Sequence, residues 1–313
     1  GTSKGLNRYN KLAGKFTVFR PDSLNSQSIL SDMVVSLYHD RAGNIWAGTV
    51  EGLCRLVDTT GRFERFRNPE QANPDDANII WSVSEMPSGI ILTGTNNGVY
   101  SLDPASRVFT RLLGSPEQDK LVAWALNVQK NGVVWIGTHR GLFRLSGLQD
   151  TAGVFLHDPN DIRSLPDNNV WCLFIDTCGF LWAGINNGIG KTKTTAGHFR
   201  LLSHGPGNNL SLSSPEVTAI LEDRNGRVWI GTNGGGLNCL DPGWTEISVF
   251  NQANSGFRND NIYALAEDWQ GNIYIGNYQG GLHRYDASNG TFFAYPVNTG
   301  KANSLNNRRV LTL

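Results

Sequence analysis

Short apolar runs alternate with polar turns along the whole chain, and the same order of runs returns at regular intervals. In one unit, residues 34–38 form an apolar run, 39–43 a turn with Asp and Gly, and 44–49 a run that ends in Gly-Thr. Residues 52–57 and 62–66 form a third and a fourth run. Runs of this length bounded by turn residues predict β-strands, and no useful stretch has the helical period of 3.6. Each unit therefore predicts four antiparallel strands.

The Gly of the Gly-Thr step gives the period of the repeat. It stands at positions 1, 48, 94, 137, 184, 231 and 276, which are 43 to 47 residues apart. Seven units of about 45 residues, each with four strand-like runs, are typical of a β-propeller. We therefore predict an all-β fold, in which residues 1–313 form a single seven-bladed β-propeller of four-stranded antiparallel blades.

Both ends of the chain predict parts of the same blade. Residues 5–9 and 15–19 have the pattern of a third and a fourth strand, and residues 310–313 match a first strand. The closing blade is therefore expected to be shared between the termini, which removes the open edge of a ring. In register with the other units, about ten residues of a second strand are missing between the two ends. The closing blade can thus be incomplete. We expect that this chain is an excised piece of a longer protein.

The composition agrees with short strands and tight turns, and it argues against several partners. The 313 residues include 36 Gly and nine Trp. Basic and acidic residues both number 27, so the zero net charge argues against a nucleic acid bound through bulk charge. The sequence has no run of eighteen apolar residues and no charged-then-apolar N-terminal segment. We therefore predict no signal peptide and no insertion into a membrane.

Candidate catalytic chemistry is sparse. The six His share no metal-ligand spacing, and no G-x-S-x-G elbow or phosphate loop occurs. The recurring turn carboxylates are expected one per blade, too far apart to share a substrate: Asp40, Asp176, Asp223 and Asp268. The four Cys lack the spacing of a zinc site. A disulfide between Cys172 and Cys178 stays open, because such short-range pairs often fail disulfide geometry. We expect no catalytic residue, no metal and no cofactor.

The repeat has a consensus of its own, D-x-x-G-x-x-W-x-G-T-x-x-G-L. One unit carries it in full: Asp40, Gly43, Trp46, Gly48, Thr49, Gly52 and Leu53. Another carries it with one extra glycine: Asp223, Gly226, Trp229, Gly231, Thr232 and Leu237. The departures elsewhere are Met86 and Gln129 for the Asp, Leu92 for the Trp, and Ile185 and Asn277 for the Thr. Over essentially the whole chain, this pattern resembles the two-component regulator propeller repeat.

The resemblance implies a context. Such repeats form the extracytoplasmic sensor region of hybrid two-component histidine kinases of Bacteroides-type bacteria. Two propellers often stand in tandem there, followed by a β-sandwich, a membrane helix and the kinase, and many of these sensors respond to glycan breakdown products. The resemblance therefore implies a periplasmic, non-enzymatic propeller with a small carbohydrate ligand. Its implied partners are a second propeller and a β-sandwich of the same chain, and a second copy in a homodimer.

One position of the first strand carries candidate ligand-binding residues. Alignment of the units places it at Val35, Trp81, Trp124, Trp171, Thr218 and Tyr263. In a propeller the first strands line the central channel, and their starts share a face with the loops that join strands two and three. Aromatic rings stack on sugars, while amides and cations bind hydroxyl or acidic groups. The candidate ligand-binding residues are Trp81, Trp124, Trp171, Tyr263, Asn97, His139, Arg140, Asn187, Asn233 and Tyr278.

Plainer interpretations stay open for these residues. Large aromatic residues at a repeated inner position also serve for packing between blades, and Asn-Gly pairs also serve as turn formers. His139 and Arg140 are harder to explain by turn chemistry, which makes them the best single pair for a contact. Three functions follow as hypotheses: a non-enzymatic ligand sensor, a scaffold for protein contacts whose ligand binds elsewhere, and a carbohydrate-active lyase or hydrolase.

Overall fold

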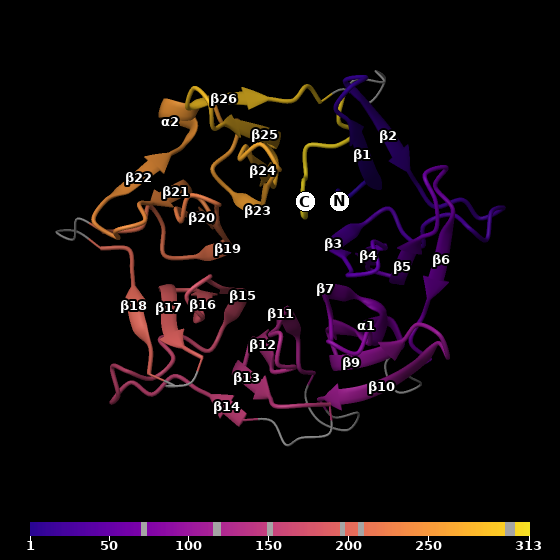
Figure 1. Cartoon of the computed structure of the whole chain (residues 1–313), viewed down its shortest axis with the longest axis horizontal. Coiled ribbons are helices and arrows are strands. Elements are labelled where there is room, and N and C mark those ends of the chain that lie inside the picture. Colours follow the sequence, from indigo (N-terminus) through magenta and orange to yellow (C-terminus); the bar gives the residue numbers. More distant parts are fainter. Residues whose placement is uncertain (70–73, 115–119, 149–152, 195–197, 206–209, 298–303) are drawn as a thin grey trace.

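Six four-stranded antiparallel sheets stand around a common axis as the blades of a β-propeller in the computed structural model (Figure 1). Within each blade the strands follow one another in chain order, and the first strand lies nearest the axis. The structure describes residues 1–69, 74–114, 120–148, 153–194, 198–205, 210–297 and 304–313. The prediction of an all-β propeller with four-stranded blades is therefore confirmed.

The blades are numbered 1 to 6 in chain order. Blade 1 comprises β3 (Val34–His39), β4 (Ile45–Thr49), β5 (Gly52–Leu56) and β6 (Phe63–Phe66). Blade 2 comprises β7 (Ile80–Glu85), β8 (Ile91–Thr95), β9 (Gly98–Asp103) and β10 (Val108–Leu113). Blade 3 comprises β11 (Ala123–Val128), β12 (Val134–Thr138), β13 (Gly141–Leu145) and β14 (Gly153–Phe155). Blade 4 comprises β15 (Val170–Ile175), β16 (Phe180–Ile185), β17 (Gly188–Lys193) and β18 (Arg200–Leu202).

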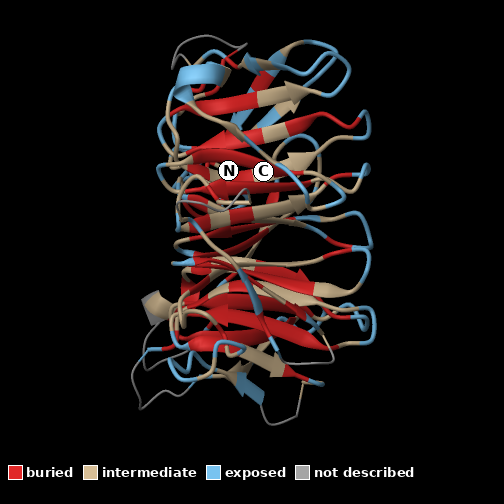
Figure 2. Cartoon of the chain, turned by 90° about the vertical axis from the view of Figure 1, so that its left-hand side faces the viewer, coloured by how far each residue is buried: buried red, intermediate tan, exposed pale blue. Residues whose placement is uncertain are grey.

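Blade 5 comprises β19 (Val217–Glu222), β20 (Val228–Thr232), β21 (Gly236–Leu240) and β22 (Ile247–Phe250). Blade 6 comprises β23 (Ile262–Glu267), β24 (Ile273–Asn277), β25 (Gly281–Asp286) and β26 (Thr291–Ala294). Figure 2 shows buried residues running through the strands and exposed residues concentrated in the loops at both faces. The buried apolar side chains form clusters between neighbouring blades, as where Trp135 of blade 3 packs with Leu181 of blade 4.

Adjacent blades meet at the Gly of the Gly-Thr step. A Cβ atom added at Gly48 would lie 2.6 Å from the carbonyl oxygen of Ile80, on the first strand of the next blade. A Cβ atom added at Gly94 would lie 2.6 Å from the carbonyl oxygen of Ala123 in the same way. Backbone cannot yield to such a contact as a flexible side chain can, so each joint requires a residue without a Cβ. The recurring Gly thus marks the joints of the ring.

A buried hydrogen bond between Asp and Trp ties together the first hairpin of three blades. In blade 1, Trp46 Nε1 donates to Asp40 Oδ2 over 2.8 Å, and the backbone N–H of Asn44 donates to Asp40 Oδ1 over 2.7 Å. In blades 4 and 5 the same bond joins Trp182 to Asp176 and Trp229 to Asp223, at 2.9 Å each. The Asp therefore caps its own turn and also satisfies the indole N–H of the second strand.

Blade 3 has kept the Trp but lost its acceptor. Gln129 stands in place of the Asp, and the Nε1 of the buried Trp135 has no hydrogen-bond partner among the described residues. Blade 2 lacks both members of the pair, since Met86 and Leu92 stand there instead and are both buried. An unsatisfied buried donor costs free energy that an apolar side chain does not. Blade 3 is therefore the blade with a defect that can be repaired.

We expect Gln129→Asp to raise the free energy of unfolding by about 1 kcal/mol, because the shorter carboxylate would accept the N–H of Trp135. Thermal unfolding followed by circular dichroism measures the gain. In a Trp135→Phe background the same substitution is expected to gain nothing, since the donor is gone. An equal gain in both backgrounds would contradict the pairing.

The Thr of the Gly-Thr step closes the hairpin between the second and third strands. Thr49 Oγ1 donates to the carbonyl oxygen of Gly52 over 2.8 Å and accepts the N–H two residues further on at 3.1 Å. Thr2 makes the same pair of bonds, the first of them to Gly5 over 2.8 Å. The chain therefore begins with a hairpin of the same kind.

Two strands near the N-terminus, β1 (Leu6–Asn10) and β2 (Lys15–Phe19), form a two-stranded antiparallel sheet, which we call the terminal sheet. The sequence predicts both strands, and they are confirmed. The predicted first strand at residues 310–313 is wrong, because the described residues offer no second strand beside it to build a ladder. Only an isolated bridge between Thr2 and Val310 forms there. The structure thus has six complete blades, and the predicted count of seven is not confirmed.

The terminal sheet fills the gap between blade 6 and blade 1 (Figure 1). On the side of blade 6, the rings of Tyr9 and Phe16 pack on Tyr295, with centroids 5.2 and 6.1 Å from it. On the side of blade 1, the ring of Phe19 lies 5.8 Å from that of Phe63. The ring of blades is therefore closed by aromatic contacts on both sides of the terminal sheet.

The remaining features of the fold are local. Two short helices, α1 (Pro74–Asn78) and α2 (Gln252–Ser255), lie in connections where the sequence predicts no helix. All four cysteines are free, so Cys172 and Cys178 do not form the disulfide that was left open. Over the described ranges, no helix is long and apolar enough to cross a membrane. The same ranges hold no group of three His, Cys, Asp or Glu placed to bind a metal ion.

Candidate functional site

The axis of the propeller holds a cavity of about 360 Å³, which we call the axial cavity. Five of the ten candidate residues line it: Trp81, Trp124, Trp171, Tyr263 and Tyr278. The other lining residues are Met33, Val35, Thr218 and Leu311. All nine side chains are uncharged, and five of them are aromatic. The structure therefore brings the aromatic candidates together in one place.

A β-bulge in each first strand sets these side chains apart from the ladder. In blade 2, Ile80 and Ser82 both pair with β8, and Trp81 between them has no partner in the ladder. The same shift leaves out Trp124 in blade 3 and Trp171 in blade 4. A bulge re-aims the side chain of its extra residue. The bulged residues of the six blades are Val35, Trp81, Trp124, Trp171, Thr218 and Tyr263.

Neighbouring rings of the axial cavity contact one another. Trp124 stacks on Trp171, with ring centroids 3.9 Å apart and planes 19° from parallel. The rings of Tyr263 and Tyr278 have centroids 5.2 Å apart. Stacked and tilted pairs of this kind stabilise a core beyond their buried area. Packing and exposure to a ligand are thus compatible here, because the rings pack on one another and still line the cavity.

The hairpin loops between second and third strands hold two of the indole N–H groups. Trp81 Nε1 donates to Asn96 Oδ1 over 2.6 Å, and Trp171 Nε1 donates to Asn186 Oδ1 over 2.7 Å. The predicted sharing of one face by these loops and the first strands is therefore confirmed. Among the described residues, the Nε1 of Trp124 has no such acceptor. It is the indole donor left available at the cavity.

The side chains of Asn187 and Asn233 bond within their own surroundings, whereas the Nδ2 of Asn97 has no hydrogen-bond partner among the described residues. The backbone N–H of the buried Asn97 donates to Thr95 Oγ1 over 3.0 Å. Asn233 Nδ2 donates to Glu216 Oε2 over 3.1 Å. The exposed Asn187 is placed near a carboxylate in the same manner, with Nδ2 3.5 Å from Asp167 Oδ2. These three side chains lie outside the lining of the axial cavity.

His139 and Arg140 also stand beside the cavity and not in its lining. The ring of His139 meets that of Trp124 edge-on at 6.0 Å, and its Nδ1 accepts the backbone N–H of Val122 at 3.3 Å. Burial, and then the charge of Arg140, lower the pKa of His139. The imidazole is therefore neutral at neutral pH and carries its proton on Nε2. Arg140 itself is exposed.

A second space of about 270 Å³ lies further along the axis. It shares five residues with the axial cavity: Val35, Trp81, Thr218, Tyr263 and Leu311. Its other lining residues include small ones that follow the bulges, such as Ser36, Ser82 and Ala219. Four of the six bulged residues, Val35, Trp81, Thr218 and Tyr263, therefore stand between two spaces on the axis.

Sequence reasoning missed Met33 and Leu311 in the lining, and it missed the contacts of Asn96 and Asn186. Leu311 had a detectable signal. Residues 310–313 match a first strand, and Val310 bridges to Thr2 much as Val34 pairs with Thr49. Extending the alignment of units to the C-terminus would therefore have placed Leu311 at the bulged position. No comparable pattern marks Met33.

The fold is that of a β-propeller with a cavity on its axis. Three segments, residues 28–51, 164–187 and 211–234, match the family model of the two component regulator propeller. They fall in blades 1, 4 and 5, which are the blades that keep the Asp–Trp hydrogen bond. Three of the blades therefore contain two-component regulator propeller repeats, and the resemblance predicted from the sequence is confirmed for these segments.

Several solved structures are similar to the chain. The extracellular domain of BT4673 from B. thetaiotaomicron, described as a hybrid two component system, is 21% identical, with a TM-score of 0.48 over 95% of this chain and 46% of its own length. PorZ from Porphyromonas gingivalis, a surface component of the type-IX secretion system, is 19% identical, with a TM-score of 0.64 over 89% of this chain and 40% of its own. An ancestral GH74 enzyme is 15% identical, with a TM-score of 0.66 over 90% and 40%.

These similarities establish the propeller fold alone, because all the identities are low. The chain spans about half the length of the B. thetaiotaomicron structure or less, and 40% of the other two. No curated protein matches the sequence. The function of the chain is therefore argued from its own residues.

Proposed function

We propose that the protein is the ligand-binding propeller of an extracytoplasmic two-component sensor, and that its axial cavity binds a small saccharide. The observation that carries the proposal is the aromatic lining of this cavity, to which three consecutive blades each contribute a Trp. The repeat family supports the sensor context. Binding would bias the arrangement of subunits in a homodimer, and through it a kinase beyond the membrane.

The chemistry of the axial cavity suits a sugar. Its volume of about 360 Å³ falls within the range of roughly 300–1,000 Å³ typical of small-molecule sites. Aromatic faces stack on the apolar face of a sugar ring. Within the described chain, the hydroxyls of Tyr263 and Tyr278 have no hydrogen bond and are free for sugar hydroxyls. Burial, with the nearby Glu216 and Tyr278, raises the pKa of Tyr263, which keeps its hydroxyl protonated as a donor.

The lining of the axial cavity supports binding over cleavage. It contains no carboxylate, whereas most glycosidases cleave with a pair of Asp or Glu residues that flank the bond. The recurring turn carboxylates are committed elsewhere, as Asp40 and Asp176 are to their Trp partners. The fold shared with an ancestral GH74 enzyme does not change this, because fold alone does not fix function. An enzyme is therefore the weaker of the candidate functions.

The proposal extends to the setting of the chain. By analogy with its repeat family, we place the propeller in the periplasm, beside a second propeller and a β-sandwich of the same chain. We also assign β1 and β2 to the third and fourth strands of a seventh blade. The hairpin bond of Thr2 to Gly5 supports this, because it repeats the bond of Thr49 to Gly52 in blade 1. Sedimentation with and without ligand tests the dimer.

Titration calorimetry against glycan oligosaccharides tests the ligand. For the oligosaccharide that binds, Trp124→Ala is expected to weaken affinity about tenfold or more, because a stacking face and an indole donor are lost. Trp269→Ala is the matched control. Trp269 lies in the turn between β23 and β24 and is 76% exposed, so its removal should leave binding unchanged.

Each alternative has its own outcome in this experiment. Silence with every oligosaccharide would favour the scaffold, in which this propeller makes protein contacts and the ligand binds elsewhere. Formation of a shortened product during the titration would favour a lyase or hydrolase. Equal weakening by both substitutions would show that the Trp residues act through stability alone.

A further inference from the structure

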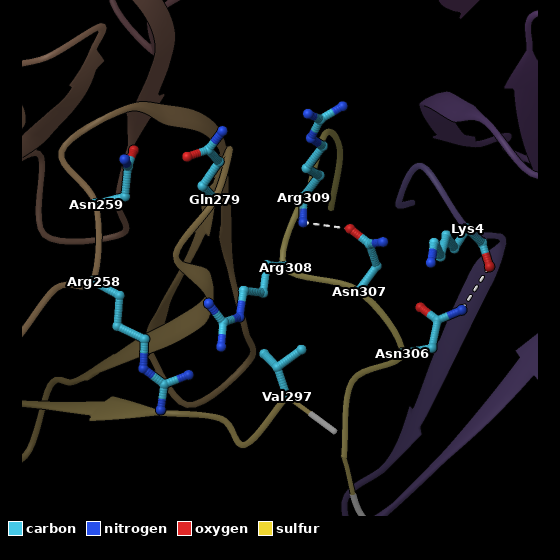
Figure 3. A pocket seen from close by; sticks show the side chains of 9 residues that line it. All are labelled: Lys4, Arg258, Asn259, Gln279, Val297, Asn306, Asn307, Arg308 and Arg309. Atoms are coloured by element: carbon cyan, nitrogen blue, oxygen red, sulfur yellow. Dashed lines mark hydrogen bonds between the residues drawn. The ribbon is translucent and has the colours of Figure 1, made fainter. Parts of the chain in front are cut away.

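A pocket of about 660 Å³ lies at the seam between blade 6 and the terminal sheet. Four of its nine lining residues are cations: Lys4, Arg258, Arg308 and Arg309. Four carry side-chain amides: Asn259, Gln279, Asn306 and Asn307. The ninth is Val297, and none of the nine is acidic. We call this space the seam pocket (Figure 3).

The cations of the seam pocket lack local compensation. In the described part of the chain, none of the four forms an ion pair with a carboxylate within 4.0 Å. Asp32 lies close enough to Lys4 for that charge to lower the pKa of the carboxyl slightly, but its main partner is Arg20. Like charges gathered without a counter-charge raise the local potential and attract an anion.

The backbone that carries these cations is fixed. Asn306 Nδ2 donates to the carbonyl oxygen of Lys4 over 2.6 Å, and Asn306 Oδ1 accepts from Asn7 Nδ2 at 2.9 Å. The N–H of Gly281 donates to the carbonyl oxygen of Arg308 over 2.9 Å. The C-terminal segment is thereby pinned to both walls of the pocket. The cations are therefore presented by a built frame, and the side chains of Arg258 and Arg308 extend toward the same space (Figure 3).

The seam pocket adjoins the axial cavity. Tyr278 lines the axial cavity and Gln279, its neighbour in the loop between β24 and β25, lines the seam pocket. The guanidinium carbon of Arg309 lies 4.9 Å from the centroid of the Tyr278 ring. The two pockets therefore meet at adjacent residues of one loop.

We propose that the seam pocket binds the acidic group of a ligand, a carboxylate or a sulfate ester. Arg pairs such groups through parallel, charge-assisted hydrogen bonds, and the amides add neutral donors. That the acid belongs to a sugar held in the axial cavity rests on the proposed function, whereas the binding of the anion does not. The protein then selects acidic over neutral saccharides.

Calorimetry at low salt with two matched pairs of probes tests the proposal. One pair is tetragalacturonate and its methyl ester, which has the same rings without the charge. The other is a sulfated galactose oligosaccharide and its desulfated form, and the two pairs tell a carboxylate from a sulfate ester. For at least one pair the charged member is expected to bind about tenfold tighter or more, and the preference should weaken as salt is added.

The double variant Arg308→Gln, Arg309→Gln is expected to abolish that preference. The matched control is Arg62→Gln, Arg163→Gln, which removes two exposed cations paired within their own turns. Arg258→Gln changes a residue of a different loop and should also reduce the preference. A cooperative thermal unfolding transition with an unchanged midpoint shows that each variant is folded. Failure of the wild-type protein to bind either charged probe, or an unchanged preference in the double variant, would overturn the proposal.

The two proposals fail separately. Binding of a charged probe that survives Trp124→Ala but is lost with Arg308 and Arg309 supports the anion site and contradicts the sugar site in the axial cavity. Binding lost with Trp124 but insensitive to both Arg substitutions does the reverse.

Discussion

Asp223→Ala is expected to lower the free energy of unfolding by about 3–5 kcal/mol. The carboxylate of Asp223 is 4% exposed and accepts from Trp229 Nε1 at 2.9 Å and from Arg227 Nε at 2.7 Å. It also accepts the backbone N–H of Asn225 at 2.9 Å. Its removal leaves the buried indole N–H of Trp229 without an acceptor, where its desolvation is no longer compensated, and it also takes the carboxylate from the partly exposed guanidinium of Arg227. Urea denaturation followed by near-ultraviolet circular dichroism measures the loss.

Asp58→Ala is the matched control for this substitution. Asp58 also caps a turn, with Thr60 Oγ1 at 2.6 Å and Arg62 Nε at 2.5 Å, but it lies at the surface and has no indole partner. Water can replace its hydrogen bonds, so we expect a far smaller loss. If the two substitutions cost the same, the buried bond between Asp223 and Trp229 does not stabilise the blade as argued.

Acidification from pH 7 to pH 4.5 is expected to cost about 2–3 kcal/mol of stability through His283 alone. His283 is 1% exposed, and neither ring nitrogen has a partner among the described residues. Burial, and then the charge of Arg258, lower its pKa from 6.5 to about 4. Because the unfolded chain takes up this proton more readily than the folded one, the contribution is complete above pH 6.5 and is lost as the pH falls toward 4.

His283→Phe is expected to remove this part of the acid sensitivity. The ring of His283 meets that of Phe257 at 5.1 Å in apolar surroundings, so a phenyl ring suits the place. His39→Gln, at the exposed end of β3, should leave the decline unchanged. Burial alone would raise the pKa of Asp268, but hydrogen bonds from Lys11 and Asn272 lower it to about 2, so its contribution is lost at lower pH. An equal decline in His283→Phe and in the wild-type protein between pH 6.5 and 4.5 would contradict the assignment to His283.

Most of the fold could be predicted from the repeat alone. Strand positions in blade 1 agree with expectation to within a residue, because each run is bounded by a Gly or Asp that its turn requires. The outcome at the C-terminus could not be predicted, since a pattern like that of Val310 to Leu313 becomes a strand only if a neighbour pairs with it. The role of the turn Asp could be predicted only in part. Its co-occurrence with the Trp six residues later was present in the sequence, but the indole hydrogen bond needs the register of the hairpin.

The candidate site divides along a similar line. The aromatic residues were found because they share one register position, and the bulge that makes this position special is a property of pairing between strands, which no single strand reveals. Loop residues of the site were harder to predict. Asn96 and Asn97 are the same residue type in adjacent positions, and only their hydrogen bonds distinguish them: Asn96 accepts the indole N–H of Trp81, whereas the backbone N–H of Asn97 donates to the Thr95 hydroxyl. The seam pocket was invisible, because Lys4 and Arg308 are almost the whole chain apart.

The separation of the two ends along the sequence bears on when the contacts of the seam between blade 6 and the terminal sheet form during folding. Joints between successive blades connect segments about 45 residues apart, whereas the hydrogen bond of Asn7 Nδ2 to Asn306 Oδ1 closes a loop of 299 residues. By the logarithmic dependence on loop length, this closure costs only about 2 kcal/mol more than a joint between neighbours. It is nevertheless the contact that must wait for the others, because the two ends meet only after the intervening blades have assembled. We therefore expect the molecule to fold as a series of neighbouring blades and to close into a ring in its last step.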